Sequence, residues 1–153
     1  MFDIAVEKEG PLHLFDLTLK GESIVYNGIL GITDIAYEML KAKEDSILVQ
    51  KERNHLKSLN NDQQRAMYLR GRFVCKMSVA NYICVKDLLS IKIRYGVFNQ
   101  PLLDAPISVS ISHSKDFAAC IVFPDELPMR LDLEMIHRNA EELIGSQQTG
   151  EEI

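Results

Sequence analysis

Residues 107–134 read ISVSISHSKDFAACIVFPDELPMRLDLE and contain three strand-like segments on which the predicted fold rests. Residues 107–113 and 129–134 alternate apolar and polar side chains, which is the period of a strand with one buried face. Residues 117–123 are almost continuously apolar, which indicates a buried strand. A turn signal, Ser114-Lys115-Asp116, separates the first two segments. We therefore predict a small antiparallel sheet.

A long helix is predicted near residues 62–84, because this segment contains no proline and only one glycine. Its apolar side chains recur at helical spacing and form one stripe: Phe73, Met77, Ala80 and Cys84. The remaining elements are expected to be a strand at 12–20, a returning strand at 24–26, a short helix opened by Thr33 and Asp34, and a helix from about Leu48. Since strands and helices do not alternate regularly, the fold class is α+β, with the sheet packed on the long helix.

The composition is that of an ordinary globular protein. The chain has 153 residues, of which 46% are hydrophobic and 25% charged, so it holds one domain or a little more than half of a two-lobed protein. The net charge of −5 argues against a nucleic-acid partner, and no apolar run is long enough to span a membrane. The N-terminus does not resemble a signal peptide. The three cysteines form no CxxC pair, which favours reduced thiols and a cytoplasmic location.

Two carboxylates on the predicted strand 129–134 form a candidate metal site. Asp132 and Glu134 share one face of that strand, with Cα atoms roughly 6.6 Å apart. Their oxygens could converge on Mg²⁺, which binds one or two carboxylates together with substrate phosphates and water. The alternative is a solvent-facing polar strand with Arg130 and Arg138 as partners.

A candidate anion site lies at the end of the strand 107–113. Ser112, His113 and Ser114 together offer several hydrogen-bond donors to a phosphate. His113 is in phase with the apolar residues of its strand, however, so it could instead be a histidine at the edge of the core.

A cationic stripe runs along the predicted long helix, on a different face from the apolar one. Arg65, Arg72 and Lys76 lie at i, i+7 and i+11. Arginine guanidinium groups bind phosphate oxygens in a bidentate manner, so the stripe could hold a phosphate. The alternative is a solvated helix face, as most charged stripes are.

Taken in order, these motifs resemble the surfactin-type 4′-phosphopantetheinyl transferases over residues from about 48 to 138. Four segments carry the resemblance: RAMYLRGR (65–72) is similar to the family's basic helix, YG (95–96) with NQPL (99–102) to its G-K-P loop, ISHS (111–114) to its S-H-S strand end, and RLDLE (130–134) to its G-I-D-I-E strand. The resemblance implies one lobe of the family's pseudo-dimer, formed by an incomplete transferase domain at 48–153, with the unassigned residues 1–47 in the same domain.

The family moves the phosphopantetheine arm of coenzyme A onto a serine of an acyl or peptidyl carrier protein. By resemblance, Arg65 and Arg72 would face the 3′-phosphate of coenzyme A, with Lys76 as a helper. His113, with Ser112 beside it, would hold another phosphate of the coenzyme. Asp132 and Glu134 would bind the Mg²⁺ that contacts the pyrophosphate, and together with His113 they would form the catalytic set.

The sequence also departs from the family pattern. Gln100 stands where the family usually has lysine, and Arg130 replaces a glycine. The family's W-x-x-K-E segment is absent, because the sequence contains no tryptophan. We therefore expect an enzyme whose catalytic second lobe is lost, truncated or supplied by another polypeptide, and whose activity alone is doubtful. The alternative is a non-catalytic remnant that binds coenzyme A or a carrier protein.

Overall fold

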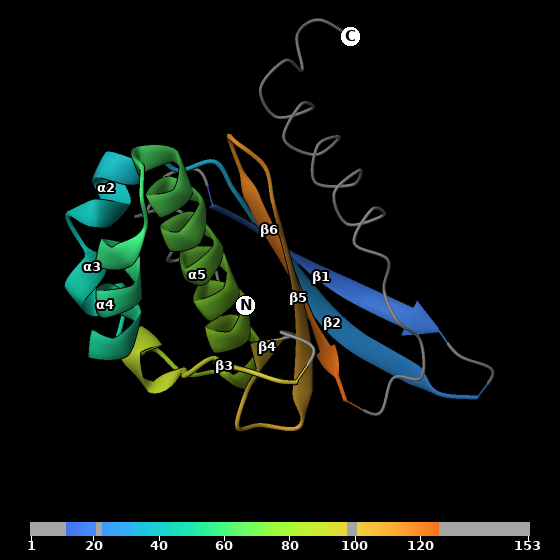
Figure 1. The fold of residues 1–153 in the computed structure, drawn as a ribbon. Helices are drawn as coiled ribbons and strands as arrows, with labels where there is room; N and C mark the ends of the chain where they lie inside the picture. The colour runs from blue at the N-terminus through green and yellow to red at the C-terminus, as the bar shows by residue number, and fades with distance from the viewer. Residues whose placement is uncertain (1–11, 21–22, 98–100, 126–153) are drawn as a thin grey trace, which may run out of the picture.

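The computed structural model describes residues 12–20, 23–97 and 101–125, and its core is a four-stranded antiparallel sheet (Figure 1). The strands are β1 (Leu12–Lys20), β2 (Val25–Thr33), β5 (Ile107–His113) and β6 (Ala118–Pro124), in the order β1-β2-β6-β5. The α+β class is therefore confirmed. The predicted strand 107–113 is observed with the same bounds, and 117–123 is observed one residue later. The predicted strand 129–134 lies outside the described residues.

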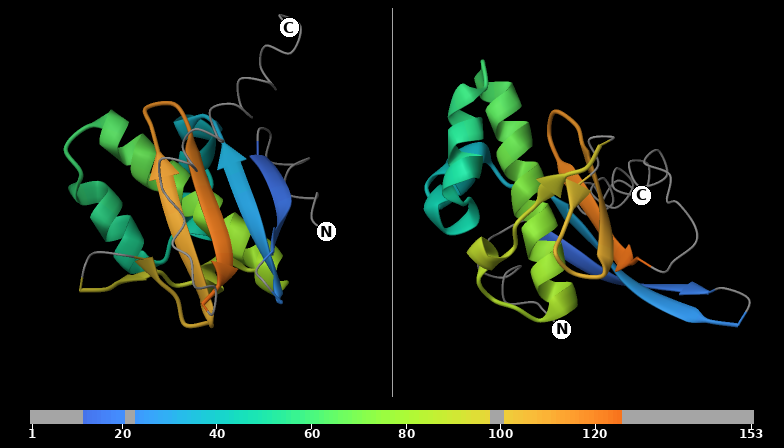
Figure 2. Two further views of the ribbon diagram at one scale, coloured as in Figure 1. Left: turned by 90° about the vertical axis from the view of Figure 1, so that its right-hand side faces the viewer. Right: turned by 60° about the horizontal axis from the view of Figure 1, so that its bottom comes forward.

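The described helices all lie on one side of this sheet (Figures 1 and 2). They are α2 (Tyr37–Lys41), α3 (Glu44–Ile47), α4 (Gln50–Ser58), α5 (Asp62–Ile83) and the short 3₁₀ helix η1 (Leu88–Ser90). Helix α5 contacts β2, β5 and β6, and α2, α3 and α4 also contact it. It is thus the middle layer of three. Among the described helices, none has the length and apolar character needed to cross a membrane.

Helix α5 matches the predicted helix closely because both ends carry local signals. Its N-cap is Asn61, whose side-chain Oδ1 accepts a hydrogen bond from the backbone N–H of Gln64 at 2.9 Å. It ends at Cys84, which adopts the left-handed conformation with φ of 61°. Of the predicted apolar stripe, Phe73 and Ala80 are buried, Met77 is half-buried and Cys84 is exposed at the helix end.

Strand β2 is much longer than the predicted strand 24–26, so that prediction is corrected. It runs through Asn27 and Gly28, a dipeptide that usually marks a turn, and ends at Thr33. A Cβ at Gly28 would lie 2.7 Å from the backbone oxygen of Val122 on β6, so the glycine permits close pairing of the two strands. Thr33 does not open a helix. Its Oγ1 accepts from the N–H of Ile35, and α2 begins only at Tyr37.

The sheet is apolar on both faces. The face toward α5 contributes Leu12, Ile107, Val109, Ala118, Cys120 and Val122 to the main core. The opposite face carries a second cluster of buried residues: Leu30, Ile32, Phe117, Ala119, Ile121 and Phe123. Strand β6 lies between β2 and β5 and contributes to both clusters, which explains its continuous apolar sequence.

A two-stranded ribbon lies beside the end of β5. It consists of β3 (Arg94–Tyr95) and β4 (Pro101–Leu102), with Tyr95 opposite Pro101 in the antiparallel register. Strand β4 contacts β5. The predicted turn between β5 and β6 is also present, because Ser114 N–H donates to the carbonyl oxygen of Phe117 at 2.9 Å. The ribbon and this turn both adjoin the strand that ends at His113.

Candidate functional site

A hollow of about 230 Å³ lies where α5 passes the end of β5 and the ribbon. It brings together two residues singled out in the sequence, Arg72 and His113. Its other lining residues are Met67, Tyr68, Gly71, Tyr95, Pro101 and Ile111. The hollow thus combines a guanidinium, an imidazole and two phenol rings, a set of groups that can bind a phosphate or another anion beside an apolar surface.

Gly71 leaves open space between α5 and β5 at this hollow. A Cβ at this position would be 3.5 Å from Cδ2 of His113 and 3.6 Å from Cγ2 of Ile111. These are ordinary van der Waals distances, so the missing side chain leaves space rather than relieving a clash. His113, the last residue of β5, is exposed, and its ring is on the same side of the strand as Ile111.

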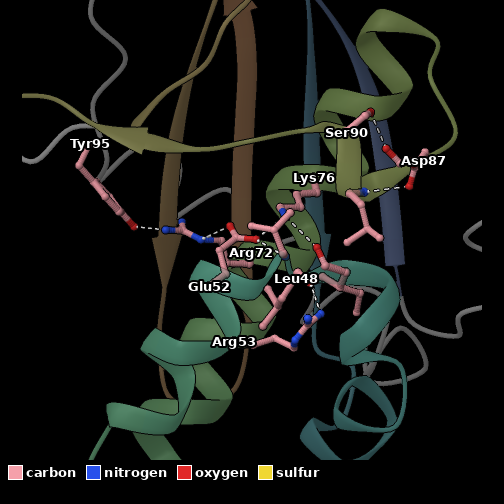
Figure 3. Close-up of polar contacts among 11 residues, drawn as sticks. Leu48, Glu52, Arg53, Arg72, Lys76, Asp87, Ser90 and Tyr95 are labelled. Atoms are coloured by element: carbon pink, nitrogen blue, oxygen red, sulfur yellow. Dashed lines mark hydrogen bonds and ion pairs between the residues drawn. The ribbon is translucent and has the colours of Figure 1, made fainter.

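Arg72 lies between Tyr95 and Glu52, which contact different nitrogen atoms of its guanidinium (Figure 3). Its Nη2 donates a hydrogen bond to the hydroxyl of Tyr95, and its Nε lies 3.1 Å from Oε2 of Glu52 in an ion pair. The guanidinium carbon is 4.8 Å from the ring centroid of Tyr68 and 5.1 Å from that of Tyr95, within the range of cation–π contacts. Burial raises the pKa of Tyr68, whose phenol therefore stays protonated beside Arg72. Only 5% of Arg72 is exposed.

Lys76 lies one turn further along α5, and its surface exposure is 0%. Its Nζ is 2.5 Å from Oε1 of Glu52 and donates to the carbonyl oxygen of Ile47 at 2.8 Å. Burial lowers the pKa of Lys76, although Glu52 acts in the opposite direction. Arg72 and Lys76 are therefore not on a solvated helix face, the alternative considered for the stripe. Lys76 does not line the hollow, and its role toward a phosphate stays a prediction.

The two other predicted coenzyme-binding residues are not among those that line the hollow. Arg65 lies near the start of α5, where its Nη1 is 2.8 Å from Asp62 Oδ1 and its Nη2 donates to the carbonyl oxygen of Leu59. Ser112 pairs with Ala119 of β6 and is adjacent to His113 on an alternating strand, so the two side chains are on opposite faces.

The predicted metal ligands Asp132 and Glu134 lie outside the described residues, as do Arg130 and Gln100. Within residues 12–20, 23–97 and 101–125, no group of three histidine, cysteine, aspartate or glutamate side chains could hold a metal ion. The Mg²⁺ site therefore stays a prediction from the sequence.

The sequence analysis did not predict that Glu52 belongs to this site, although its carboxylate contacts both Arg72 and Lys76. It is the third residue of α4, and its Oε1 also accepts from the backbone N–H of Val49 at 3.1 Å. An acidic residue in the first turn of a helix is the ordinary signal for a capping interaction. No local pattern indicates that the same carboxylate contacts Arg72 and Lys76, twenty or more residues later.

A larger hollow, of about 550 Å³, lies between β1, β2 and the end of α5. Among its lining residues are Asp16, Asn27, Tyr82 and Cys84. None of the candidate site residues predicted from the sequence lines this larger hollow, so the volume of a hollow does not identify the functional site in this chain.

The comparisons with known proteins agree with this architecture. Neither a protein-family model nor a curated protein matches the sequence. Among solved structures, the chain is similar to a holo-(acyl-carrier-protein) synthase from Bacillus anthracis in complex with CoA (3′,5′-ADP), at 27% identity and a TM-score of 0.51, over 62% of this chain and 93% of that one. It is also similar to the ACPS–CoA complex of Chronobacterium ammoniagenes, at 15% identity and a TM-score of 0.50, over 61% and 92% of the two chains. The second likeness concerns the fold alone.

The resemblance inferred from the sequence motifs is thereby confirmed at the level of the superfamily and of the fold. The described helices and antiparallel sheet correspond to a single lobe of that architecture. The chain therefore has the fold of the holo-(acyl-carrier-protein) synthases, which are members of the 4′-phosphopantetheinyl transferase superfamily.

Proposed function

We propose that this chain binds coenzyme A at the hollow lined by Arg72 and His113 and takes part in transferring its phosphopantetheine arm to a carrier-protein serine. The observation that carries the proposal is this hollow, found in a fold shared with a synthase whose structure is a complex with CoA (3′,5′-ADP). The cluster of Arg72, His113 and two phenols along its wall suits an anionic ligand.

Each predicted residue has a role in this proposal. Arg72 binds the 3′-phosphate of coenzyme A, because its guanidinium borders the hollow. Arg65, two turns before it on α5, extends the same positive surface toward the nucleotide. His113, at the end of β5, binds a second phosphate. Ser112 pairs with Ala119 of β6 and holds this end of β5 in place. Lys76, one turn after Arg72 on α5, does not line the hollow but adds a positive charge next to it.

The reaction is a displacement at phosphorus. The carrier serine loses its hydroxyl proton to a base, directly or through water, and its oxygen forms a bond to the phosphorus that bears the pantetheine arm. The bond from that phosphorus to the leaving 3′,5′-ADP breaks. Arg72 and His113 stabilise negative charge on the phosphate oxygens and hold the nucleotide in place. Asp132 and Glu134 would hold Mg²⁺, since paired carboxylates are the donors that this ion prefers. The ion, when bound, neutralises charge on the pyrophosphate.

We propose further that one lobe needs a complement, either a second polypeptide or a second copy of this chain. The aligned region is 93% of the Bacillus anthracis synthase but only 62% of this chain, so that synthase has the shorter chain. We place the reaction in the cytoplasm, in agreement with three free cysteines.

The decisive experiment measures transfer of a labelled phosphopantetheine arm from coenzyme A to an apo carrier protein with Mg²⁺. Wild type is expected to transfer it slowly alone and faster when a complementing lobe is added. Asp132→Ala and His113→Ala should abolish the transfer, whereas Asp45→Ala, which removes a surface carboxylate, should not change it. If wild type neither binds coenzyme A in calorimetry nor transfers the arm, the proposal is wrong.

A second candidate function is binding of coenzyme A or a carrier protein without catalysis. It is favoured by the absence of the family's W-x-x-K-E segment from the sequence, which leaves a chain that could bind the coenzyme without the full catalytic set. Coenzyme A binding with no transfer under any complementation would support this second function.

A further inference from the structure

We infer that Glu52 is a positioning residue for the coenzyme A site: its carboxylate, on α4, fixes the orientation in which Arg72 borders the hollow. This inference rests on the proposed function. Glu52 does not line the hollow itself, so it acts only through Arg72.

The carboxylate of Glu52 is itself held in place. Oε1 accepts from Lys76 Nζ at 2.5 Å and from Val49 N–H at 3.1 Å (Figure 3). Oε2 lies 3.1 Å from Arg72 Nε in a buried ion pair that does not have the geometry of a hydrogen bond. Glu52 is 6% exposed, so water has little access to replace these contacts. A carboxylate with three fixed partners is a rigid reference point for the arginine.

The contacts of Arg72 leave its guanidinium little freedom. Glu52 pairs with the Nε edge, the Tyr95 hydroxyl accepts from Nη2, and the rings of Tyr68 and Tyr95 lie within cation–π distance. An arginine whose rotamers are restricted before the ligand arrives loses less conformational entropy on binding. Of these contacts, the one with Glu52 carries a full opposite charge, so its loss should affect the orientation most.

Charge neutralisation by Glu52 and positioning of Arg72 by Glu52 predict opposite effects on anion binding. Two buried cations share one carboxylate, which leaves the cluster of Glu52, Arg72 and Lys76 with a net charge of +1. If screening were its main effect, replacing Glu52 by glutamine would increase the positive charge and strengthen anion binding. If positioning dominates, the same change weakens binding, because a glutamine NH₂ facing Arg72 Nε is a donor facing a donor. The two effects have opposite signs.

The test compares the affinities of the full chain for coenzyme A and dephospho-coenzyme A by calorimetry, in wild type, Glu52→Gln and the surface control Glu38→Gln. We expect Glu52→Gln to weaken coenzyme A binding about tenfold or more while dephospho-coenzyme A binding stays unchanged. In an Arg72→Ala background, Glu52→Gln should have no further effect on the ratio of the two affinities. Glu38→Gln should behave as wild type. Unchanged or tighter coenzyme A binding by Glu52→Gln overturns the inference, as does an equal loss for both ligands.

A second measurement does not depend on coenzyme A. Because Arg72 is buried and its Nε lies 3.1 Å from Glu52 Oε2, the Nε–Hε signal of Arg72 in an NMR spectrum should be sharp in wild type, and it should shift, broaden or disappear in Glu52→Gln. If wild type shows this signature but binds no coenzyme A, the proposed function fails while the positioning of Arg72 by Glu52 stands. If Glu52→Gln leaves the signal unchanged, the positioning is disproved whatever the ligand binding.

Discussion

Gly71 of α5 lies directly against His113 at the end of β5, so that a methyl group at position 71 would be 3.5 Å from His113 Cδ2. Gly71→Ala should therefore have opposite effects on stability and on binding. The free energy of unfolding should rise by about 0.5–1 kcal/mol, because alanine is the better residue inside a helix and no clash prevents it. The affinity for coenzyme A should fall, since the methyl group occupies the hollow. Urea unfolding and calorimetry measure the two effects, and a stabilised variant with unchanged affinity would contradict our assignment of the site.

Gly31 of β2 provides a contrasting case. A Cβ there would overlap Ser78 Oγ and lie 3.2 Å from Val74 Cγ2, so Gly31→Ala should lower the free energy of unfolding by about 1–3 kcal/mol. Ser78→Ala removes the clashing oxygen, and the double variant should therefore be more stable than Gly31→Ala alone. Strictly additive effects in chemical denaturation would show that the predicted clash does not exist.

The buried cluster predicts an order of stabilities. Glu52→Gln should lower the free energy of unfolding by about 3–5 kcal/mol, because it leaves two buried cations without a counter-charge. Lys76→Met should cost only about 1–3 kcal/mol, mainly through the unpaired carbonyl of Ile47, since a one-to-one pair of Glu52 and Arg72 remains. Denaturant unfolding at pH 7 measures both. If Lys76→Met is the more damaging change, Glu52 is not the centre of the cluster.

Lys76 also predicts a pH dependence. Burial lowers the pKa of Lys76 in the folded protein below the ordinary value of 10.5. At a pH between the lowered pKa and 10.5, the unfolded chain therefore binds more protons than the folded one. The Lys76 contribution to stability should therefore increase as the pH rises through this window. Unfolding of wild type and Lys76→Met, measured side by side up to pH 10, should show wild type gaining relative to the variant. A constant difference would mean that the pKa of Lys76 is not lowered.

The three cysteines should differ in reactivity. Cys84 is exposed, whereas Cys75 and Cys120 are buried and burial raises the pKa of Cys120 well above its ordinary value. A thiol reagent should modify Cys84 rapidly in the native protein and the other two only on unfolding. Cys84→Ser should abolish the rapid reaction. Fast modification of Cys120 in the folded chain would contradict the packing of β6 against α5.

Much of the fold could be predicted because it depends on local patterns. The alternation in 107–113, the apolar run after Asp116 and the proline-free helix from Asp62 are each contained in a few adjacent residues. Strand β2 was underestimated for a related reason: Asn27-Gly28 is a strong turn signal, and only the close approach of β6 explains why a glycine lies inside the strand.

The sequence by itself determined which residues are the candidates for the chemistry, since Arg72 and His113 stand out through the motifs that contain them. Only the tertiary structure decided how they are arranged. It packs α4 on α5, so that Glu52 pairs with Arg72 and Lys76, and it places Tyr95 of the ribbon against the same guanidinium. The physical reason is that charge pairing acts through space between separate elements. Helix and strand periodicity, in contrast, are properties of neighbouring residues along the chain.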